Sequence, residues 1–401
     1  MNLHFDIIII GGGASGLLCA VTAKQHNPSL RVAVIEKNDR VGKKLLSTGN
    51  GRCNLTHDNI SPADYVGEAW ALKPVFDAID TPTLLDRFQR LGLLTFRDSE
   101  GRYYPLSRQA SAVLDVLRFH CENLGVEMFC GETAVSVKAQ NTFRVQTKQN
   151  TYFAQKLVIA AGSKAAPKLG GCDSVTQLNI GHRAVPFSPA LCPILVRSDI
   201  LRSLKGLRAQ AEVRLERGGK TLRSERGEVQ FNEDNLSGIC VFNLSLFTTP
   251  DSTVTLDLLP DISDTELYNI LQKNQNRFSR QSADNLFTGI LQKRIAVAVL
   301  KAAEVKNFSR PCSALGEDEL RRAAECAKSL RFSVKGNAGF DRAQACRGGV
   351  TVKGQVDPVT LESRLRKNLY FCGEALDICG VCGGYNLHFA FASGIIAGEQ
   401  L

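Results

Sequence analysis

The chain has 401 residues, 44% hydrophobic and 22% charged, which is the composition of an ordinary globular protein larger than one hydrophobic core. No stretch is long and apolar enough to cross a membrane, and the N-terminus lacks the basic region and cleavage signal of a secreted protein. We therefore expect a cytoplasmic protein of two or three domains that has no membrane partner.

The net charge of +9 favours anionic ligands such as nucleotides or acidic substrates. Because the chain has no long run of Lys and Arg and no basic stripe interleaved with aromatic residues, a nucleic-acid partner is disfavoured and a small-molecule substrate is expected. Thirteen scattered cysteines are typical of a large intracellular enzyme with free thiols. The oligomeric state is left open.

The first predicted elements form a βαβ unit around a glycine-rich turn. The apolar run Ile7–Ile10 predicts a buried strand, and the residues after it follow the pattern Gly-x-Gly-x-x-Gly at Gly11, Gly13 and Gly16. A helix over 17–25 and a strand over 31–35 follow, and Glu36 comes about 20 residues after the last glycine. In such a unit the helix N-terminus binds a pyrophosphate and the acid binds a ribose diol. The alternative is a glycine turn without a phosphate.

The remaining elements are predicted from periodicity and turn residues. In the first half we expect helical spacing over 74–93, a hairpin over 94–104, an amphipathic helix over 110–124, short strands over 126–129, 134–137, 143–147 and 151–153, and a buried strand over 156–160. In the second half we expect strands within 191–259, a helical stretch over 261–330 with helices at 283–305 and 317–330, strands from 331 and over 368–372, and a terminal helix over 385–399.

This order of elements indicates an α/β fold. A nucleotide-binding domain is interrupted, because both chain ends carry its strands while the middle of the chain reads as β and then helical. We place the nucleotide domain at 1–185 and 341–401, a β substrate domain at 186–260 and 331–340, and a helical domain at 261–330.

A basic, glycine-rich segment over 42–54 follows Glu36 closely. Lys44 and Arg52 suit phosphate contacts, while Gly49 and Gly51 allow the backbone to approach a flat ring. A surface loop is the alternative.

The tail carries a second acidic and glycine-rich segment. A buried strand leads into Gly373-Glu374-x-x-Asp377, where an acid could bind sugar hydroxyls or lie beside a diphosphate, and Gly384 then opens the terminal helix. The free N–H groups and dipole at that helix start would stabilise negative charge that develops on a reduced cofactor ring.

Several motifs together resemble one known family. They are Gly-Gly-Gly-Ala-Ser-Gly at 11–16, Gly-Lys-Lys-Leu at 42–45, Gly-Asn-Gly-Arg-Cys-Asn at 49–54, Phe-Ser-Val-Lys-Gly at 332–336, Gly-Phe-Asp-Arg-Ala-Gln at 339–344, Gly-Gly-Val at 348–350, Thr-Leu-Glu-Ser at 360–363, Gly-Glu-Ala-Leu-Asp at 373–377 and Cys-Gly-Gly-Tyr-Asn-Leu at 382–387. The chain resembles the bacterial FAD-dependent oxidoreductases labelled flavoprotein or aminoacetone oxidase family, which include a bile-acid enone reductase. The likeness covers nearly the whole chain.

The resemblance implies a Rossmann-like FAD-binding domain of the two-dinucleotide-binding type, with an inserted β-barrel-like domain and a small helical domain. It implies non-covalent FAD, with a substrate pocket between the FAD domain and the insertion. The cofactor residues that it implies, together with the pattern above, are Gly11, Gly13, Ala14, Ser15, Gly16, Glu36, Lys37, Lys44, Thr48, Gly49, Gly51, Arg52, Cys53, Asn54, Ala134, Ala161, Gly162, Gly373, Glu374, Asp377, Gly384, Tyr385, Asn386 and Leu387.

Two departures from the family pattern affect the expected flavin edge. Cys346-Arg347 replaces the usual Thr-Ala, and the stretch 164–182 is short and lacks the usual glycine–tyrosine pattern. Cys379 and Cys382 form a Cys-x-x-Cys pair. With no second pair in the sequence a metal site is not expected, and the pair is read either as a redox dithiol or as small residues packed beside the flavin.

Tyr385 and His388 are the candidate proton donors, although a packed or hydrogen-bonded structural role is the more common one for a helix histidine. Only one complete glycine fingerprint exists, so an NAD(P)H donor would dock transiently at the ring. Three functions stay open: reduction of an activated, conjugated double bond by NAD(P)H, oxidation of a small amine or amino ketone with release of peroxide, and an FAD-bearing scaffold or RNA-modification role.

Overall fold

The computed structural model describes residues 2–401 and divides them into two compact units. The outer unit consists of the chain up to Ala190 together with Gly339–Leu401, and the inserted unit consists of Leu191–Ala338. The division lies a few residues away from the boundaries expected at 185 and 341, because strand β11 (Ala184–Ala190) pairs with β18 (Ala345–Val350) of the outer unit. The helical segment 261–330 does not separate from the β strands of the insertion.

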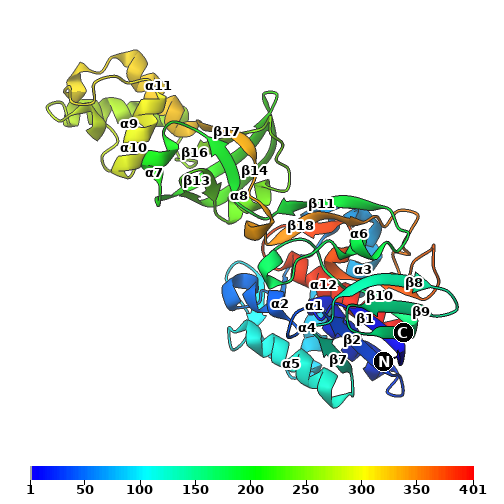
Figure 1. Cartoon of the computed structure of the whole chain (residues 1–401). Coiled ribbons are helices and arrows are strands. Elements are labelled where there is room, and N and C mark those ends of the chain that lie inside the picture. Colours follow the sequence, from blue (N-terminus) through cyan, green and yellow to red (C-terminus); the bar gives the residue numbers. More distant parts are fainter. Residues whose placement is uncertain (1) are drawn as a thin grey trace. The chain divides into compact units, whose positions relative to one another are not determined.

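The outer unit is built on a sheet of seven strands (Figure 1). Its order is β7-β2-β1-β10-β9-β8, and β19 also pairs with β10. The strands are β1 (Asn2–Ile10), β2 (Val32–Glu36), β7 (Glu127–Cys130), β8 (Ala134–Ala139), β9 (Phe143–Thr147), β10 (Thr151–Ile159) and β19 (Leu369–Phe371). β1 pairs in parallel with both β2 and β10, and the run Ile7–Ile10 is buried on both faces, which explains its unbroken apolar sequence. The expected Rossmann-like fold is confirmed.

Helices cover this sheet. The three longest are α1 (Ala14–His26), α5 (Ala110–Asn123) and α12 (Tyr385–Glu399), and the shorter ones are α2 (Lys43–Ser47), α3 (Lys73–Ala78), α4 (Thr81–Arg90) and α6 (Ser174–Leu178). Helices α1 and α12 lie side by side (Figure 1). A Cβ at Gly394 would come within 2.4 Å of the Ser15 carbonyl oxygen, so glycine permits this close approach.

The helix expected over 74–93 is two helices. The Asp80 carboxylate accepts a hydrogen bond from the Thr83 backbone N–H and so caps a new helix, α4, whose first turn carries a proline. Periodicity alone did not predict the break, because both halves keep their apolar faces toward the core.

Three small sheets complete the outer unit. They consist of β3 (Thr56–His57), β6 (Arg102–Pro105) and β5 (Thr95–Arg97), of β20 (Ile378–Gly380) with β4 (Tyr65–Gly67), and of β11 with β18. The β20–β4 pair connects the tail to the segment after the glycine-rich loop, because Ile378 pairs with Gly67 and Gly380 with Tyr65.

The inserted unit contains a closed barrel, which confirms the expected β-barrel-like insertion. Its strands, in barrel order, are β12 (Ile194–Arg197), β15 (Asn235–Ser237), β14 (Lys220–Phe231), β13 (Arg208–Arg217), β16 (Thr253–Asp257) and β17 (Leu330–Asn337). Its helices are α7 (Leu201–Leu204), α8 (Ile239–Leu244), α9 (Asp264–Arg277), α10 (Lys293–Ala302) and α11 (Glu317–Lys328).

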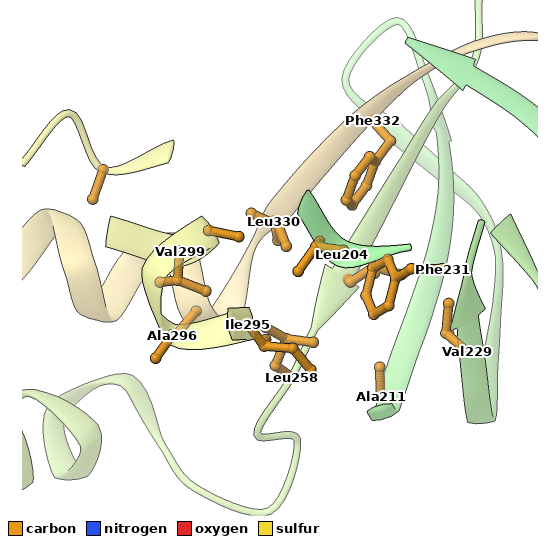
Figure 2. Packing of buried hydrophobic residues seen from close by; sticks show 14 of the residues in the cluster. Leu204, Ala211, Val229, Phe231, Leu258, Ile295, Ala296, Val299, Leu330 and Phe332 are labelled. Atoms are coloured by element: carbon orange, nitrogen blue, oxygen red, sulfur yellow. The ribbon is translucent and has the colours of Figure 1, made fainter. Parts of the chain in front are cut away.

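The barrel and the helices of the inserted unit share one hydrophobic core. Figure 2 shows Ile295 and Val299 of α10 close to Leu258 and Leu330, in the same cluster as Phe231 and Phe332 on the barrel strands. One continuous cluster of buried residues therefore joins the barrel to the helices.

The helix expected over 283–305 is reduced to the 3₁₀ turn Ala283–Asn285 and to α10. Gly289, at φ +81° between them, adopts a conformation that ends a helix.

Candidate nucleotide-binding site

In the turn between β1 and α1, two glycines are required by contacts within the protein. Gly11 has φ +109°, and a Cβ there would lie 2.3 Å from the Ala160 carbonyl oxygen. A Cβ at Gly16 would lie 2.0 Å from the Gly11 carbonyl oxygen, so this glycine lets α1 begin close to the strand.

Gly13 is different, because a Cβ at this position would meet no atom within 4 Å among the described residues. Its φ of −91° suits any residue, so the fold alone does not explain a glycine there. No side chain of residues 2–401 caps α1 at Gly13. An uncapped helix start beside an open glycine face is the arrangement that admits a pyrophosphate.

Glu36 ends β2 next to this turn and is 7% exposed. Its Oε2 accepts a hydrogen bond from the Gly12 backbone N–H at 2.9 Å, and its Oε1 accepts from the backbone N–H and the side-chain amide of Asn38, each at 2.8 Å. Oε2 keeps a second acceptor position that suits a ribose hydroxyl. The glutamate is therefore fixed by the protein before any ligand binds.

A cleft of about 800 Å³, including space open to solvent, lies at the carboxyl ends of these strands. Predicted cofactor residues that line it are Gly11, Gly13, Glu36, Lys37, Lys44, Ala134, Ala161 and Gly162. Ala14, Ser15 and Gly16 form the adjoining first turn of α1. The cleft lies entirely within the outer unit.

Other lining residues were not predicted. They are Gly12, Asn38, Gly42, Lys43, Glu132, Thr133, Ser163, Leu169, Gly170, Gly171, Cys172, Gln177 and Leu178, with Ile10, Ile35 and Ala160 at the strand ends. The double glycine at 170–171 is the sequence signal that could have identified part of this set. In the structure, a Cβ at Gly171 would collide with the Ala165 carbonyl oxygen at 2.0 Å. The three strand-end residues and Gly12, Asn38, Lys43, Thr133 and Ser163 directly adjoin predicted residues, and the others reach the cleft only through the tertiary structure.

One charged cluster joins this cleft to the tail of the chain. Lys44 Nζ lies 2.6 Å from Oε2 of Glu374, and the Ser163 hydroxyl donates to the same oxygen at 3.0 Å. Gly373 begins the turn that carries Glu374, and a Cβ there would lie 2.7 Å from Ser15 Oγ at the start of α1. The structure thus brings three predicted segments together.

The predicted segment 48–54 lies against the start of α12. A Cβ at Gly384 would lie 2.7 Å from the Thr56 carbonyl oxygen and 2.8 Å from Asn54 Oδ1. Asn54 is 8% exposed, and its Oδ1 has no hydrogen-bond partner among the described residues. A buried amide oxygen of this kind needs a donor, and the N–H of a flavin ring would supply one.

Other predicted residues of this segment are divided between surface and core. Gly49 and Arg52 are exposed, Thr48 and Gly51 are half-buried, and Cys53 is fully buried. Burial raises the pKa of the Cys53 thiol to about 12, so this cysteine stays a thiol at neutral pH.

Two tail residues are occupied by contacts within the protein. Asn386 pairs with the backbone of Gly380, accepting from its N–H at 2.9 Å and donating to its carbonyl at 2.8 Å. Asp377 Oδ1 accepts from the Gly348 N–H at 2.9 Å, and burial raises the pKa of Asp377. These contacts fasten β20, β18 and α12 together. Leu387 is half-buried in the first turn of α12.

The two candidate proton donors have contrasting surroundings. Tyr385 stacks on the half-buried ring of His57 at 5.2 Å, and burial raises the pKa of Tyr385 to about 12. His388 is 0% exposed, with Nδ1 2.8 Å from Thr56 Oγ1 and Nε2 2.9 Å from the Ile79 carbonyl oxygen. Burial lowers the pKa of His388 to about 4. This environment favours the structural role that the sequence left open.

The cysteines supply neither a disulfide nor a metal centre in the described part of the chain. All thirteen are free thiols, and no group of three or more potential ligands is found among residues 2–401. Burial raises the pKa of Cys379 well above its usual range, which gives no support to a reactive dithiol with Cys382. Cys346, one of the departures from the family pattern, is buried, and desolvation raises its pKa to about 11.

Among residues 2–401, no helix has the length and apolar character needed to span a bilayer.

The family model for the HI0933-like protein Rossmann domain matches residues 5–400. The chain is 32% identical to 3-dehydro-bile acid delta(4,6)-reductase of Clostridium scindens, over 98% of this chain and 97% of that protein. It is 27% identical to the ribosomal RNA dihydrouridine synthase of Escherichia coli K12, over 99% of this chain and 98% of that protein.

Solved structures show the same fold at low sequence identity. The 3-ketosteroid-delta4-(5alpha)-dehydrogenase of Rhodococcus jostii RHA1 has a TM-score of 0.50 and 13% identity, covering 99% of this chain and 96% of that one. The FrdA chain of Escherichia coli quinol fumarate reductase has a TM-score of 0.50 and 15% identity, covering 100% of this chain and 70% of that one.

The residues present fit a bound FAD. The open face of Gly13 and the uncapped start of α1 accommodate a diphosphate, and the unpartnered Asn54 oxygen lies where the flavin end is expected. The expectation of a flavin enzyme is confirmed at the level of the family. The chain belongs to the HI0933-like Rossmann family and is an FAD-dependent oxidoreductase.

Proposed function

We propose that this protein uses NAD(P)H to reduce a carbon–carbon double bond conjugated to a carbonyl group in a small organic substrate. The observation that carries the proposal is the pair of full-length relatives. The name of one specifies a reductase of double bonds in a 3-keto bile acid, and that of the other specifies synthesis of dihydrouridine. Dihydrouridine is uridine with a carbonyl-conjugated ring double bond saturated, so both names describe one type of chemistry.

FAD, when bound, would supply the two-electron hydride chemistry of such a reaction. The start of α1 and the fixed carboxylate of Glu36 would hold the adenosine diphosphate half. The start of α12, which no side chain of the described residues caps at Gly384, would stabilise negative charge at the flavin end. Asn54 would orient the ring through its unpartnered oxygen.

Saturation of a conjugated double bond also consumes one proton. We assign its delivery to Tyr385 Oη, because Tyr385 is the first residue of α12 and follows Gly384, where the flavin end is expected, and a phenol carries a proton at neutral pH. Burial raises the pKa of Tyr385 to about 12, so the hydroxyl would donate its proton only to a strongly basic, reduced substrate. The half-buried His57 stacks on that ring. His388 is not proposed for this role, because its two ring nitrogens are occupied by contacts with Thr56 and Ile79.

The electron donor is proposed to dock only transiently. The sequence has one glycine fingerprint, so a second resident nucleotide site of the same type is not expected. A nicotinamide that leaves before the substrate enters would give ping-pong kinetics.

Cofactor reduction without air tests the proposal. Addition of NADH or NADPH to the purified yellow protein should bleach the flavin absorbance, and a 3-keto-4-ene steroid or another conjugated enone should restore it with one product formed per cofactor oxidised. Failure of both nicotinamides to bleach the flavin would contradict the proposal. Rapid peroxide release with aminoacetone in air would instead support the oxidase alternative.

A second candidate function is reduction of uridine in RNA. The name of the Escherichia coli relative, matched over 98% of its length, favours this candidate, as does the net charge of +9. Ribosomal RNA lacking dihydrouridine, supplied to the reduced protein, should then reoxidise the flavin and gain dihydrouridine, with binding that weakens as salt increases. If free enones reoxidise the flavin and RNA does not, the small-molecule function stands.

A further inference from the structure

The strand order of the outer unit gives each part of an adenosine diphosphate its place. Strand β1 ends at the glycine turn, its neighbour β2 ends at Glu36, and β7 pairs in parallel with β2 through Glu36 and Cys130. Neighbouring strands are about 4.8 Å apart. The end of each successive strand therefore lies beside the next chemical group of the nucleotide, counted from the pyrophosphate. The end of β7 therefore lies where the base would follow the ribose.

Glu132 stands at this position, two residues after β7. Its backbone N–H donates to the Glu36 carbonyl oxygen at 3.0 Å, which fixes it beside the ribose acid, and the residue lines the cleft. Its side chain is 8% exposed. Oε1 accepts a hydrogen bond from Asn150 Nδ2 at 2.6 Å, whereas Oε2 is buried and has no partner among the described residues.

An unpartnered carboxylate oxygen in such a place costs free energy unless a ligand satisfies it. An ionised carboxylate only accepts hydrogen bonds, so the ligand group must be a donor. The 6-amino group is the exocyclic donor of adenine, whereas hypoxanthine has an acceptor oxygen at the same position. We propose that Glu132 Oε2 accepts a hydrogen bond from the adenine amino group and selects adenine dinucleotides.

This inference rests on the assignment of FAD to the cleft. The hydroxyl of Tyr152 is the competing donor within the chain. It is also buried, and its pKa is raised by that burial first and then by the charge of the nearby Glu132 carboxylate and a weak hydrogen bond to it. If Tyr152 alone satisfied the carboxylate, the identity of the base would not matter to Glu132. Nucleotide exchange can separate these two cases.

The experiment compares two nucleotides on the full chain stripped of cofactor. Dissociation constants are measured by quenching of flavin fluorescence for FAD and for its hypoxanthine analogue, in which a carbonyl oxygen replaces the amino group. We expect the wild-type chain to prefer FAD by at least about tenfold. In Glu132→Gln the side-chain amide can donate to that oxygen, so the preference should shrink by about tenfold or reverse.

Glu362→Gln is the matched control, because the Glu362 carboxylate accepts from the Asn368 N–H at 2.7 Å and does not line the cleft. Its two dissociation constants should equal those of the wild type. Glu132→Ala, which removes the acceptor without adding a donor, should bring the two constants together, and circular dichroism reports whether each variant is folded.

Three results would overturn the inference. The first is equal binding of both nucleotides by the wild-type chain, a result that does not depend on whether any variant folds. The preference of Glu132→Gln and Glu132→Ala could equal that of the wild type, which would assign the selection to the backbone or to Tyr152. A wild-type chain that binds neither nucleotide would overturn the FAD assignment itself and this inference with it.

Discussion

Single residues of the β1–α1 turn are glycine for different physical reasons. At Gly11 and Gly16 a side chain would collide with backbone oxygens of the protein, so the fold requires glycine. At Gly13 the space is open, so the requirement comes from a ligand that approaches the backbone. The three glycines of one motif can therefore be separated by substitution.

We expect Gly13→Ala to weaken FAD binding by at least about tenfold. Its free energy of unfolding without cofactor should stay within about 1 kcal/mol of the wild type, because φ −91° suits alanine. Gly16→Ala should instead lower that free energy by several kcal/mol, roughly the cost of severe overpacking. Equilibrium urea unfolding and flavin fluorescence titration measure the two effects. Equal loss of stability in both variants would contradict the distinction.

His388 gives a pH dependence whose sign is fixed by its burial. Its pKa in the folded chain is about 4 against an ordinary value of 6.5, so the unfolded chain binds a proton in this range and the folded chain does not. The stabilisation is present above pH 6.5 and is lost as the pH falls toward 4. When the pH falls from about 7 to about 5, this histidine should lower the free energy of unfolding by roughly 2 kcal/mol.

Urea unfolding of the cofactor-free wild type and of His388→Gln at these two pH values checks this prediction. The variant should be less stable at neutral pH but should lose roughly 2 kcal/mol less than the wild type on acidification. The same loss in both proteins would show that other groups carry the acid sensitivity.

Tyr385 provides the residue-scale test of proton delivery. Tyr385→Phe should lower kcat for substrate reduction by about 10²-fold or more, which is the usual contribution of a general acid, while NAD(P)H still bleaches the flavin at the wild-type rate. The matched control is Tyr268→Phe, whose hydroxyl bonds to Glu317 in the inserted unit. Rapid-mixing absorbance spectroscopy separates the two half-reactions. An unchanged reoxidation rate in Tyr385→Phe would remove Tyr385 from the mechanism.

At the scale of elements, the packing of helices on the barrel includes one buried ion pair. Lys328, the last residue of α11, lies 2.7 Å from Asp257 at the end of β16, and the two side chains are 12% and 10% exposed. Lys328 Nζ also donates to the carbonyl oxygens of Leu259 and Ile262, each at 2.7 Å. One ammonium group therefore joins the end of α11, the end of β16 and the segment that leads from β16 to α9.

Removal of one partner should cost more than the pair contributes, because a charge is left buried. We expect Lys328→Met to lower the free energy of unfolding by about 3 kcal/mol. The control is Lys205→Met, which breaks an exposed pair with Glu233 and should change stability by less than about 1 kcal/mol. Urea midpoints measure both variants. Equal effects would mean that the Lys328 pair is no stronger than a surface pair.

At the scale of the whole molecule, the chain divides into an outer unit that contains the whole nucleotide cleft and an inserted unit with its own core. Barrel and helices in the inserted unit share that core, so they should gain and lose structure together.

Residues 191–338 expressed alone should fold and unfold in a single transition. Calorimetry and circular dichroism should give the same midpoint, with a calorimetric enthalpy equal to the van't Hoff enthalpy. Two separated transitions would instead support an independent helical domain over 261–330. The outer unit, which holds every lining residue of the cleft, should account for cofactor binding in the full chain.

The sequence by itself determined the βαβ unit, the order of most elements and the family, because local periodicity and glycine spacing encode them. It also placed Glu36 beside the turn, since that contact spans a single βαβ unit.

Only the tertiary structure decided which side chains meet. Glu374 reaches Lys44 and Ser163 across more than half the chain, Glu132 reaches the cleft through the pairing of β7 with β2, and both nitrogens of His388 are occupied by distant segments. Hydrogen bonding and burial at these positions depend on strand order and helix packing, which no local pattern of residues records.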